Sequence, residues 1–303
     1  MNHYPLVSII IPAYKADNYI QEALDSVHNQ TYPNWEVIVV EDAWKDRTEE
    51  IVQQFSAQVG ENRVKFLRHE VNQGLAATRN TGIAIASGEY IALLDHDDIW
   101  LPEYLTHLIA ALELNQSDFA YSGVTMFNET VDELWICAPN EDDLNNFPAS
   151  LFYHRNFITP SATVIRRAVF DKIGFFNAGL RSCEDYEFWL RCARANCTFS
   201  YVTGNLCRYR KHGVSLSNDS EVMSQTLLSV IKQNLNWETV PYALKCKRLV
   251  GVYRQIIYVK ASKSIVDTLS FVMQEWWESP IKVQMVKTSL KAIATNLLKP
   301  SAV

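Results

Sequence analysis

Acidic residues stand directly after an apolar segment in the first third of the chain. Asp95, His96, Asp97 and Asp98 follow the run at 90–94. A carboxylate about 4 Å from a diphosphate charge costs about 4 kcal/mol at an effective dielectric constant of about 20, unless a cation lies between them. Mg²⁺ and Mn²⁺ prefer oxygen ligands and are commonly held by one or two carboxylates together with substrate phosphates. The cluster therefore predicts a divalent-metal site, while Asp98 could instead cap the following helix.

Two further acidic pairs are placed where they could act on a ligand. Glu41 and Asp42 follow the second apolar run, and Glu184 and Asp185 open a predicted amphipathic helix at 184–195. The carboxylate of Asp42 could accept a hydrogen bond from a nucleobase N–H, or it could serve only as a turn residue. Asp185 could take a proton as a general base, or it could complement the helix dipole.

The elements that must position these residues alternate between short apolar runs and helical patterns. This alternation is typical of βαβ units and a mainly parallel sheet. Ligands of such sheets lie beyond the carboxyl ends of the strands, which selects the loops at 12–17, 41–46 and 95–100. Strands are expected at 7–11, 36–40, 64–67 and 90–94, and helices at 18–29, from about 46, and at 74–86.

The pattern changes after the first 122 residues. An acidic, irregular insertion is expected at 123–148, followed by strands at 162–165 and 199–202 and the helix at 184–195. Beyond about residue 219 the pattern is helical. We therefore expect an α/β domain over 1–218, in two parts at about 1–122 and 123–218, and a helical extension over 219–303.

Composition excludes several classes of protein. A hydrophobic fraction of 48% with 20% charged residues is ordinary for a folded domain, and the net charge of −6 argues against nucleic acid as a partner. Six cysteines without zinc-site spacing suggest reduced thiols. The chain begins without a signal-like segment and has no apolar run of about 18 residues, so a cytoplasmic location is expected.

Several segments together resemble one known family. They are VSIIIPAY at 7–14, LDSVHNQTY at 24–32, NQGLAATRNTG at 72–82, GEYI at 88–91, DHDD at 95–98 and EDYEFWLR at 184–191. In this order, over about residues 5–216, the sequence resembles a family 2 glycosyltransferase with the GT-A fold of nucleotide-diphospho-sugar transferases. A looser match, at 209–217, resembles a family loop that closes near the donor phosphates.

The resemblance implies a nucleotide-binding part at about 1–122 and an acceptor part at about 123–218, and it implies roles for individual residues. Asp97 would coordinate Mn²⁺ or Mg²⁺, and Asp185 would be the catalytic base. Tyr14 and Asp42 would lie near the base, and Asp95 near the ribose and sugar. Glu184 and His212 are assigned to a loop near the donor phosphates or the acceptor. The complete set implied to bind the donor is Pro12, Ala13, Tyr14, Glu41, Asp42, Arg79, Asp95 and His96.

The implied reaction is an inverting transfer of a sugar from a nucleotide diphosphate to a hydroxyl acceptor. UDP is the expected nucleotide, and a lipid-linked glycan is one candidate acceptor in polysaccharide or glycoconjugate synthesis. A metal-assisted in-line displacement would be expected, with the metal stabilising the departing diphosphate.

One departure from the family pattern concerns the second loop. Ala43 and Trp44 stand where the family usually has Gly-Ser, and alanine tolerates positive φ poorly, so base selectivity is in question. Two other functions stay open. A sugar-phosphate nucleotidylyltransferase would be expected to carry a glycine-rich loop after the first strand, which 12–16 lacks, and a catalytically silent nucleotide-sugar-binding subunit has only 41–44 in its favour.

The last predicted helix, at about 281–298, combines an apolar stripe with lysines. From 279 to the end there is no Asp or Glu. Such a helix could pack on its own domain or on a second subunit, or dock on an anionic membrane surface, such as the inner face of the membrane. The stripe consists of Val283, Val286, Leu290, Ile293 and Leu297, and the lysines are Lys282, Lys287 and Lys291.

Overall fold

Four parallel strands form the N-terminal half of a mixed sheet. They are β1 (Val7–Ala13), β2 (Trp35–Glu41), β3 (Val64–Arg68) and β4 (Tyr90–Leu93), in the order β3-β2-β1-β4. Every residue of β1, β2 and β4 is buried, which is why their sequences read as nearly continuous apolar runs. Because the strands are parallel, the loops that follow β1, β2 and β4 meet at one edge of the sheet.

The second half of the sheet is largely antiparallel. β8 (Thr163–Arg166) pairs with β4, and the order continues through β6 (Phe119–Phe127), β9 (Phe199–Arg210) and β5 (Ile99–Trp100), while β7 (Trp135–Cys137) pairs with β6. The expected irregular segment therefore begins as a strand, and the last strand is longer than expected. Both differences arise because β6 and β9 pair in parallel along their length, with irregularities between Ser122 and Val124.

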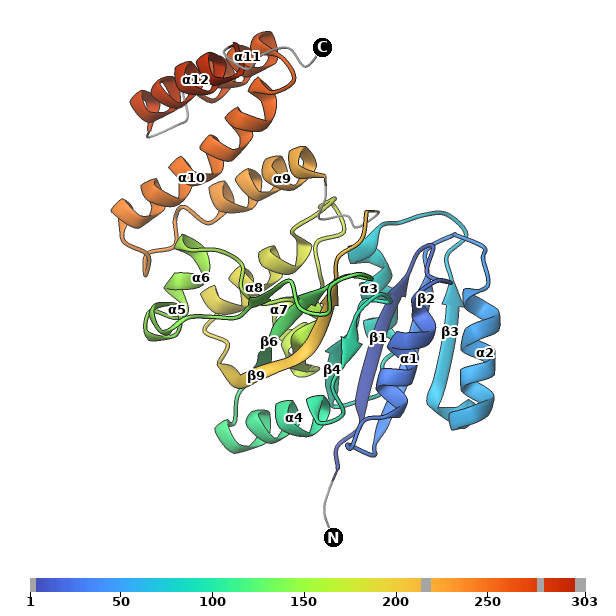
Figure 1. Ribbon diagram of the computed structural model, residues 1–303. Coiled ribbons are helices and arrows are strands. Elements are labelled where there is room, and N and C mark those ends of the chain that lie inside the picture. The colour runs from blue at the N-terminus through green and yellow to red at the C-terminus, as the bar shows by residue number, and fades with distance from the viewer. Residues whose placement is uncertain (1–3, 214–218, 277–280, 298–303) are drawn as a thin grey trace. The chain divides into compact units, whose positions relative to one another are not determined.

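Helices cover this sheet (Figure 1). α1 (Ile20–His28) packs on α2 (Thr48–Val59), α3 (Leu75–Ala84) on β1 and β2, and α4 (Tyr104–Asn115) on β6, β8 and β9. α7 (Ala168–Ile173) packs on α8 (Glu184–Arg194). The mixed α/β fold predicted from the sequence is confirmed.

The computed structural model describes residues 4–213, 219–276 and 281–297. It divides into two units: a sheet unit of residues 1–141 and 156–213, and a helical unit of residues 142–155 and 214–303. The predicted C-terminal helices are present in the helical unit, while the predicted domain limits stay predictions. Within the described ranges, no helix is long and apolar enough to cross a membrane. The helices of this region are α5 (Glu141–Asn145), α6 (Ala149–Tyr153), α9 (Ser220–Gln233), α10 (Tyr242–Ala261), α11 (Ile265–Trp276) and α12 (Lys282–Leu297).

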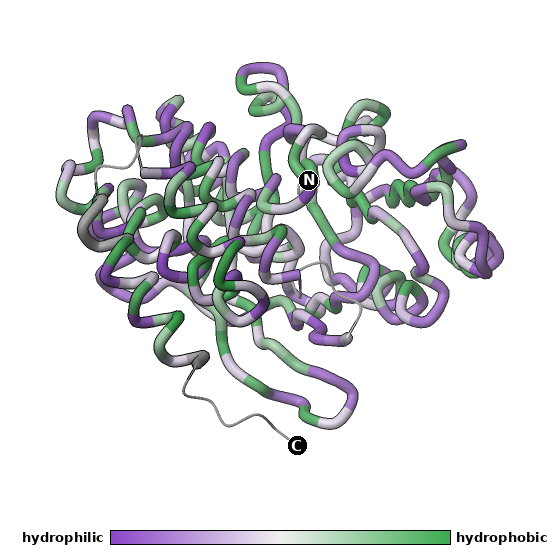
Figure 2. The backbone as a smooth tube through the Cα atoms, turned by 90° about the horizontal axis from the view of Figure 1, so that it is seen from above, coloured by the Kyte–Doolittle hydropathy of each residue, from purple (hydrophilic) through white to green (hydrophobic). Residues whose placement is uncertain are grey.

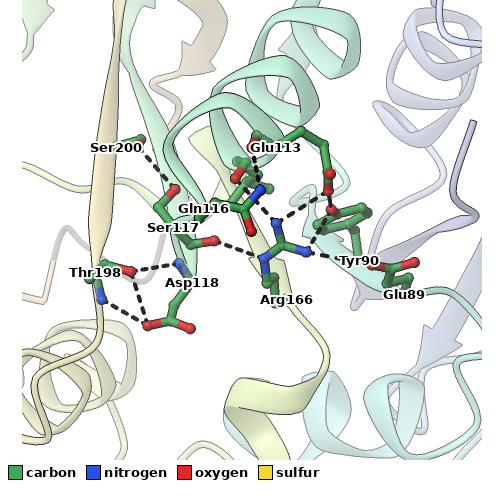
Figure 3. A network of polar contacts seen from close by, with 10 residues as sticks. Glu89, Tyr90, Glu113, Gln116, Ser117, Asp118, Arg166, Thr198 and Ser200 are labelled. Carbon is green, nitrogen blue, oxygen red and sulfur yellow. Dashed lines mark hydrogen bonds and ion pairs between the residues drawn. The ribbon is translucent and has the colours of Figure 1, made fainter.

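A polar network ties the sheet to α4 at the amino end of β4 (Figure 3). Arg166 of β8 donates from Nε to the Ser117 carbonyl at 2.9 Å and from Nη1 to the Tyr90 hydroxyl at 2.8 Å. Its Nη2 donates to Glu113 Oε1 at 3.2 Å. These contacts lie at the opposite end of β4 from the loop that begins at Asp95, so they support the fold and lie away from the candidate site.

Replacing Arg166 should therefore lower stability without lowering activity. Arg166→Met keeps the apolar stem but removes these hydrogen bonds, and we expect a loss of about 1–3 kcal/mol in the free energy of unfolding. Calorimetry should show a fall in Tm, while kcat should stay within about twofold of the parent. Arg167→Met is a matched control, because exposed Arg167 makes one long contact with the Ala86 carbonyl, at 3.4 Å. An unchanged Tm for Arg166→Met would contradict the structural role.

Candidate active site

Backbone contacts join the loops that follow β1, β2 and β4. The Asp42 amide donates to the Ala13 carbonyl at 2.8 Å, which ties the second loop to the first. His96 Nδ1 lies 3.1 Å from the Pro12 carbonyl oxygen, which ties the third loop to the first. Four of the residues predicted to bind the donor are therefore neighbours at one edge of the sheet.

The two acids after β2 have different surroundings. Glu41 is 1% exposed and pairs with Arg68, and burial raises the pKa of its carboxyl group. Asp42 holds the following loop: its Oδ1 accepts from the Gln73 amide and lies beside His69 Nδ1, and its Oδ2 accepts from the Gly74 amide, all at 2.8 Å. A carboxylate has about four lone-pair positions, and three of those of Asp42, which is 4% exposed, are occupied within the chain.

Two exposed aromatic rings stand at the same edge. Tyr14 is 42% exposed and Trp44 is 41% exposed, and their ring centroids lie 5.5 Å apart in an edge-to-face contact. The Lys15 ammonium lies 4.3 Å from the Trp44 ring centroid. Ala43 has φ 55°, so this turn takes the left-handed conformation that favours glycine, although an alanine stands there. Trp44 is thereby presented to solvent beside Tyr14.

The side chain of Asp97 contacts His212, which lies just beyond the C-terminal end of β9. His212 Nε2 lies 2.8 Å from Asp97 Oδ2, and both side chains are mostly buried. Burial alone would disfavour the charged form, but the hydrogen bond from His212 and the nearby His96 lower the pKa of Asp97. Residues 214–217 of the predicted loop lie outside the described residues, whereas His212 is described.

Arg210 supports this arrangement and was not predicted from the sequence. Its backbone amide donates to Asp98 Oδ1 at 2.9 Å, and its Nε donates to the Asp97 carbonyl at 3.0 Å. Asp98 is therefore bonded to β9 and does not cap α4, which begins at Tyr104 without a side-chain cap. Burial and the charges of Asp97 and Asp95 raise the pKa of Asp98 well above its usual range.

The chemistry of Asp97 and His212 suits a divalent metal that arrives with phosphate ligands. Among the described residues, no group of three or more His, Cys, Asp or Glu side chains could hold a metal ion. The pair still offers one carboxylate and one imidazole at the ligand edge, and Mn²⁺ accepts both kinds of ligand. A metal held by few protein ligands is completed by substrate phosphates. The pair therefore fits a metal site that a diphosphate would complete.

Arg79 links the β4 edge to the start of α8. Its Nη2 donates to Asp95 Oδ1 at 2.6 Å, and its Nη1 donates to Glu184 Oε1 at 2.5 Å. The Arg79 side chain is 1% exposed, and these carboxylates outweigh its burial and raise the pKa of the guanidinium. The structure thus brings together Arg79, Asp95 and Glu184, and it places Arg79 as a buried bridge between two acids.

Asp185, next to Glu184, combines partial access with a desolvated carboxyl group. Asn156 Nδ2 donates to its Oδ2 at 2.9 Å, a contact between residues 29 positions apart that no sequence signal indicated. Burial and the adjacent charge of Glu184 raise the pKa of Asp185 to about 7. A carboxylate with a pKa close to neutrality is well matched to general-base catalysis.

Known proteins resemble this chain in sequence and in fold. The family model described as glycosyl transferase family 2 matches residues 8–174. UDP-Glc:alpha-D-GlcNAc-diphosphoundecaprenol beta-1,3-glucosyltransferase WfgD of Escherichia coli is 32% identical, over 71% of this chain and 80% of its own length. The structure of S. aureus TarS 1–349 in complex with UDP-GlcNAc has a TM-score of 0.65 at 21% identity, covering 96% of this chain and 80% of that one.

A second solved structure, mannosyltransferase PcManGT from Pyrobaculum calidifontis in complex with GDP-Man and Mn²⁺, has a TM-score of 0.63 at 16% identity. It covers 98% of this chain and 88% of its own. These two likenesses show a common GT-A fold. The family match extends over more than half of the 303 residues and includes the loops after β1, β2 and β4. The chain therefore belongs to glycosyl transferase family 2.

Proposed function

We propose that the chain is an inverting glycosyltransferase that moves a sugar from a UDP-sugar to a hydroxyl acceptor. The observation that carries the proposal is the place of Asp185 within a family 2 glycosyltransferase fold: it lies in the first turn of α8, beside Glu184, and Asn156 donates to its Oδ2 at 2.9 Å. Burial and the charge of Glu184 raise the pKa of this carboxyl group to about 7, which suits a general base. The bridge from Glu184 through Arg79 to Asp95 connects this base to the edge where the donor would bind. Asp185 would take the proton of the acceptor hydroxyl as that oxygen attacks the anomeric carbon.

A divalent metal is part of the proposal. Asp97 and His212 would hold Mn²⁺ or Mg²⁺, and the lowered pKa of Asp97 keeps its carboxylate charged near neutral pH. When bound, the ion would neutralise the charge of the departing diphosphate. The Mn²⁺ in the complex of PcManGT supports the use of a divalent metal.

The remaining acceptor position on Asp42 supports uridine as the nucleoside. Uracil presents a single N–H between two carbonyl groups, whereas guanine presents adjacent N–H groups that a carboxylate binds best with both oxygens. Three donors already surround the Asp42 carboxylate, so it has room for one more. The names of WfgD and of the TarS complex both include a UDP-sugar.

The acceptor is proposed to be a lipid-linked glycan. This part of the proposal rests on WfgD, whose name includes a diphosphoundecaprenol acceptor. The match to WfgD covers 71% of this chain. A product of this kind would place the enzyme in glycoconjugate or polysaccharide synthesis, at the cytoplasmic face of a membrane.

A donor panel tests the proposed function directly. Purified protein is incubated with UDP-, GDP- and dTDP-sugars and Mn²⁺, with and without a diphosphoundecaprenol-linked sugar, and free nucleotide is measured. We expect UDP release that depends on metal, and NMR of the new linkage should show an anomeric configuration opposite to that of the donor. Retention of configuration would exclude Asp185 as the base of a single displacement, and release of pyrophosphate would identify a nucleotidylyltransferase.

Trp44 should contribute to nucleotide affinity through stacking. Trp44→Ala removes an exposed ring beside Tyr14 and Lys15, and stacking of a base on an aromatic side chain contributes about 1–3 kcal/mol. We expect the Kd for UDP, measured by calorimetry, to rise roughly 5- to 150-fold. Trp44→Phe should retain most of the affinity. Trp135→Ala is a matched control, because Trp135 on β7 is 51% exposed, and an equal Kd for all variants would contradict the role of Trp44.

A further inference from the structure

α11 of the helical unit leaves an apolar stripe in contact with solvent. Val266 is 75% exposed and Met273 is 73% exposed, with Ile265 at 38% and Leu269 at 47%. Their spacings of three, four and seven residues place all four on one side of the helix. The helix packs through another side, which includes buried Thr268 and Val272. The four exposed residues are called the α11 stripe below.

α12 packs through small residues beside its predicted apolar stripe, and Ile293 of that stripe is half-buried. Small residues, Ser289 at 3% and Ala292 at 0% exposure, are buried where the helix contacts α10 and α11. Val286 is 36% exposed and Leu290 is 64% exposed, and these two are called the α12 stripe. The side chains of Lys282, Val283 and Leu297 lie outside the described residues. Packing within this unit therefore does not explain Val286 and Leu290, although packing on its own domain was one of the alternatives that the sequence left open.

Basic residues flank the α12 stripe. Lys287 and Lys291 are exposed, and helical geometry places Lys287 about 60° around the axis from Leu290. The segment 279–303 contains four lysines and no acidic residue, in a chain whose net charge is −6. Figure 2 shows hydrophobic and hydrophilic residues alternating along the helix that leads to the C-terminus. Apolar side chains with lysines beside them match the headgroup boundary of an anionic membrane.

The acidic residues of α11 are Asp267 and Glu275, and a carboxylate close to the apolar stripe would repel an anionic membrane surface. Glu275 is engaged inside the unit, because its carboxylate lies 2.6 Å from the Lys232 ammonium and accepts from the Tyr253 hydroxyl at 2.7 Å. Asp267 lies on the far side of the helix from Leu269, about 160° around the axis. Asp267 is exposed and lies about 100° around the axis from Val266, so the α11 stripe is apolar with this one carboxylate at its edge.

We propose that the helical unit docks on an anionic lipid surface through the α11 and α12 stripes and the lysines of α12. A second copy of the chain fits this charge pattern less well, because a twofold contact through the α12 stripe would bring like-charged lysines together. An anionic bilayer supplies both the apolar region and the opposite charge. This inference rests on the surface of the helical unit, so it stands independently of the base, metal and donor assignments.

Vesicle flotation of the full chain tests the proposal. The parent protein should float with vesicles of phosphatidylcholine and phosphatidylglycerol but not with phosphatidylcholine alone, and high salt should release it. Lys287→Glu with Lys291→Glu should lower the bound fraction at least roughly tenfold, since each basic residue near such a surface contributes to binding. Leu269→Ser with Leu290→Ser should lower it similarly, by removing apolar contact.

Matched controls separate docking from folding and from self-association. Lys172→Glu with Lys247→Glu makes the same charge change at exposed lysines of α7 and α10 and should float like the parent. Thermal melts should show that all variants fold. Flotation of the stripe variants equal to that of the parent, or binding that does not depend on phosphatidylglycerol, would overturn the proposal. A parent dimer that Leu269→Ser with Leu290→Ser converts to monomers in light scattering, without vesicle binding, would instead identify a second copy as the occupant.

Discussion

Asp185→Asn should lower kcat by at least about 100-fold while leaving the affinity for UDP within about twofold of the parent. The amide keeps the shape of the side chain and can still accept from Asn156, but it cannot take a proton. A general base contributes roughly 10²- to 10⁴-fold to a rate, and this contribution is lost only in the transition state. Single-turnover kinetics with saturating donor and acceptor would measure the chemical step directly.

The control lies on the same helix. Glu187→Gln removes an acid from the first turn of α8, where Glu187 pairs with Arg191 at 2.9 Å, and it should change Tm more than kcat. If Asp185→Asn retained a third or more of the parent kcat, another group would carry the acceptor proton. In that case the metal and donor assignments would still stand, because they depend on other residues.

The raised pKa of Asp185 also links activity and stability to pH. The rate should rise with pH through about 7 as Asp185 loses its proton, and Asp185→Asn should lose this dependence. Since the folded pKa is raised above the usual value of 3.8, the protonated carboxyl favours the folded state at low pH, and this contribution disappears as pH rises through about 7. Asp185→Asn should therefore melt higher than the parent at pH 8 but not at pH 4. An active-site acid that costs stability at working pH is a common trade-off.

The sequence predicted the parallel half of the sheet well because local information specifies it. Every residue of β1, β2 and β4 is buried, so each strand leaves a continuous apolar run, and the acids come directly after such runs. The pairing of β6 with β9 joins segments about 80 residues apart and includes irregularities near Gly123. No local pattern encodes that register, which is why 123–127 was expected to be irregular and β9 was expected to end early.

The same contrast between local and long-range information applies to the candidate site. The identities of Asp97, Asp185 and His212 could be proposed from motifs, but their partners could not. Arg79 reaches Glu184 across 105 positions, and Asp97 reaches His212 across 115. The resemblance placed Arg79 among the donor-binding residues, and that role stays a prediction beside its observed place as a buried bridge. Burial and charge neighbours, which set the pKa of Asp185, exist only in the folded chain.

Asp97→Ala should abolish metal-dependent donor binding and reduce turnover to about 1% of the parent or less. The variant leaves His212 as the remaining ligand of the pair, and a single imidazole with phosphate oxygens holds Mn²⁺ weakly. Calorimetry of UDP binding should show that added Mn²⁺ tightens binding to the parent but not to the variant. The signal of free Mn²⁺ in electron paramagnetic resonance should fall when UDP is added to the parent and stay unchanged for Asp97→Ala.

Glu89→Ala provides the comparison for Asp97→Ala, because it removes one negative charge at the other end of β4, where Glu89 contacts Arg166 near the polar network of Figure 3. It should retain the Mn²⁺ effect. His212→Gln should weaken the effect without abolishing it, since Asp97 would remain. The Mn²⁺ effect on UDP binding should be unchanged in Asp185→Asn, whose turnover is lost, because Asp185 is not a ligand of the pair. Metal binding and catalysis should thus separate between the Asp97 and Asp185 variants, and loss of the Mn²⁺ effect in Asp185→Asn would show that one group controls them together.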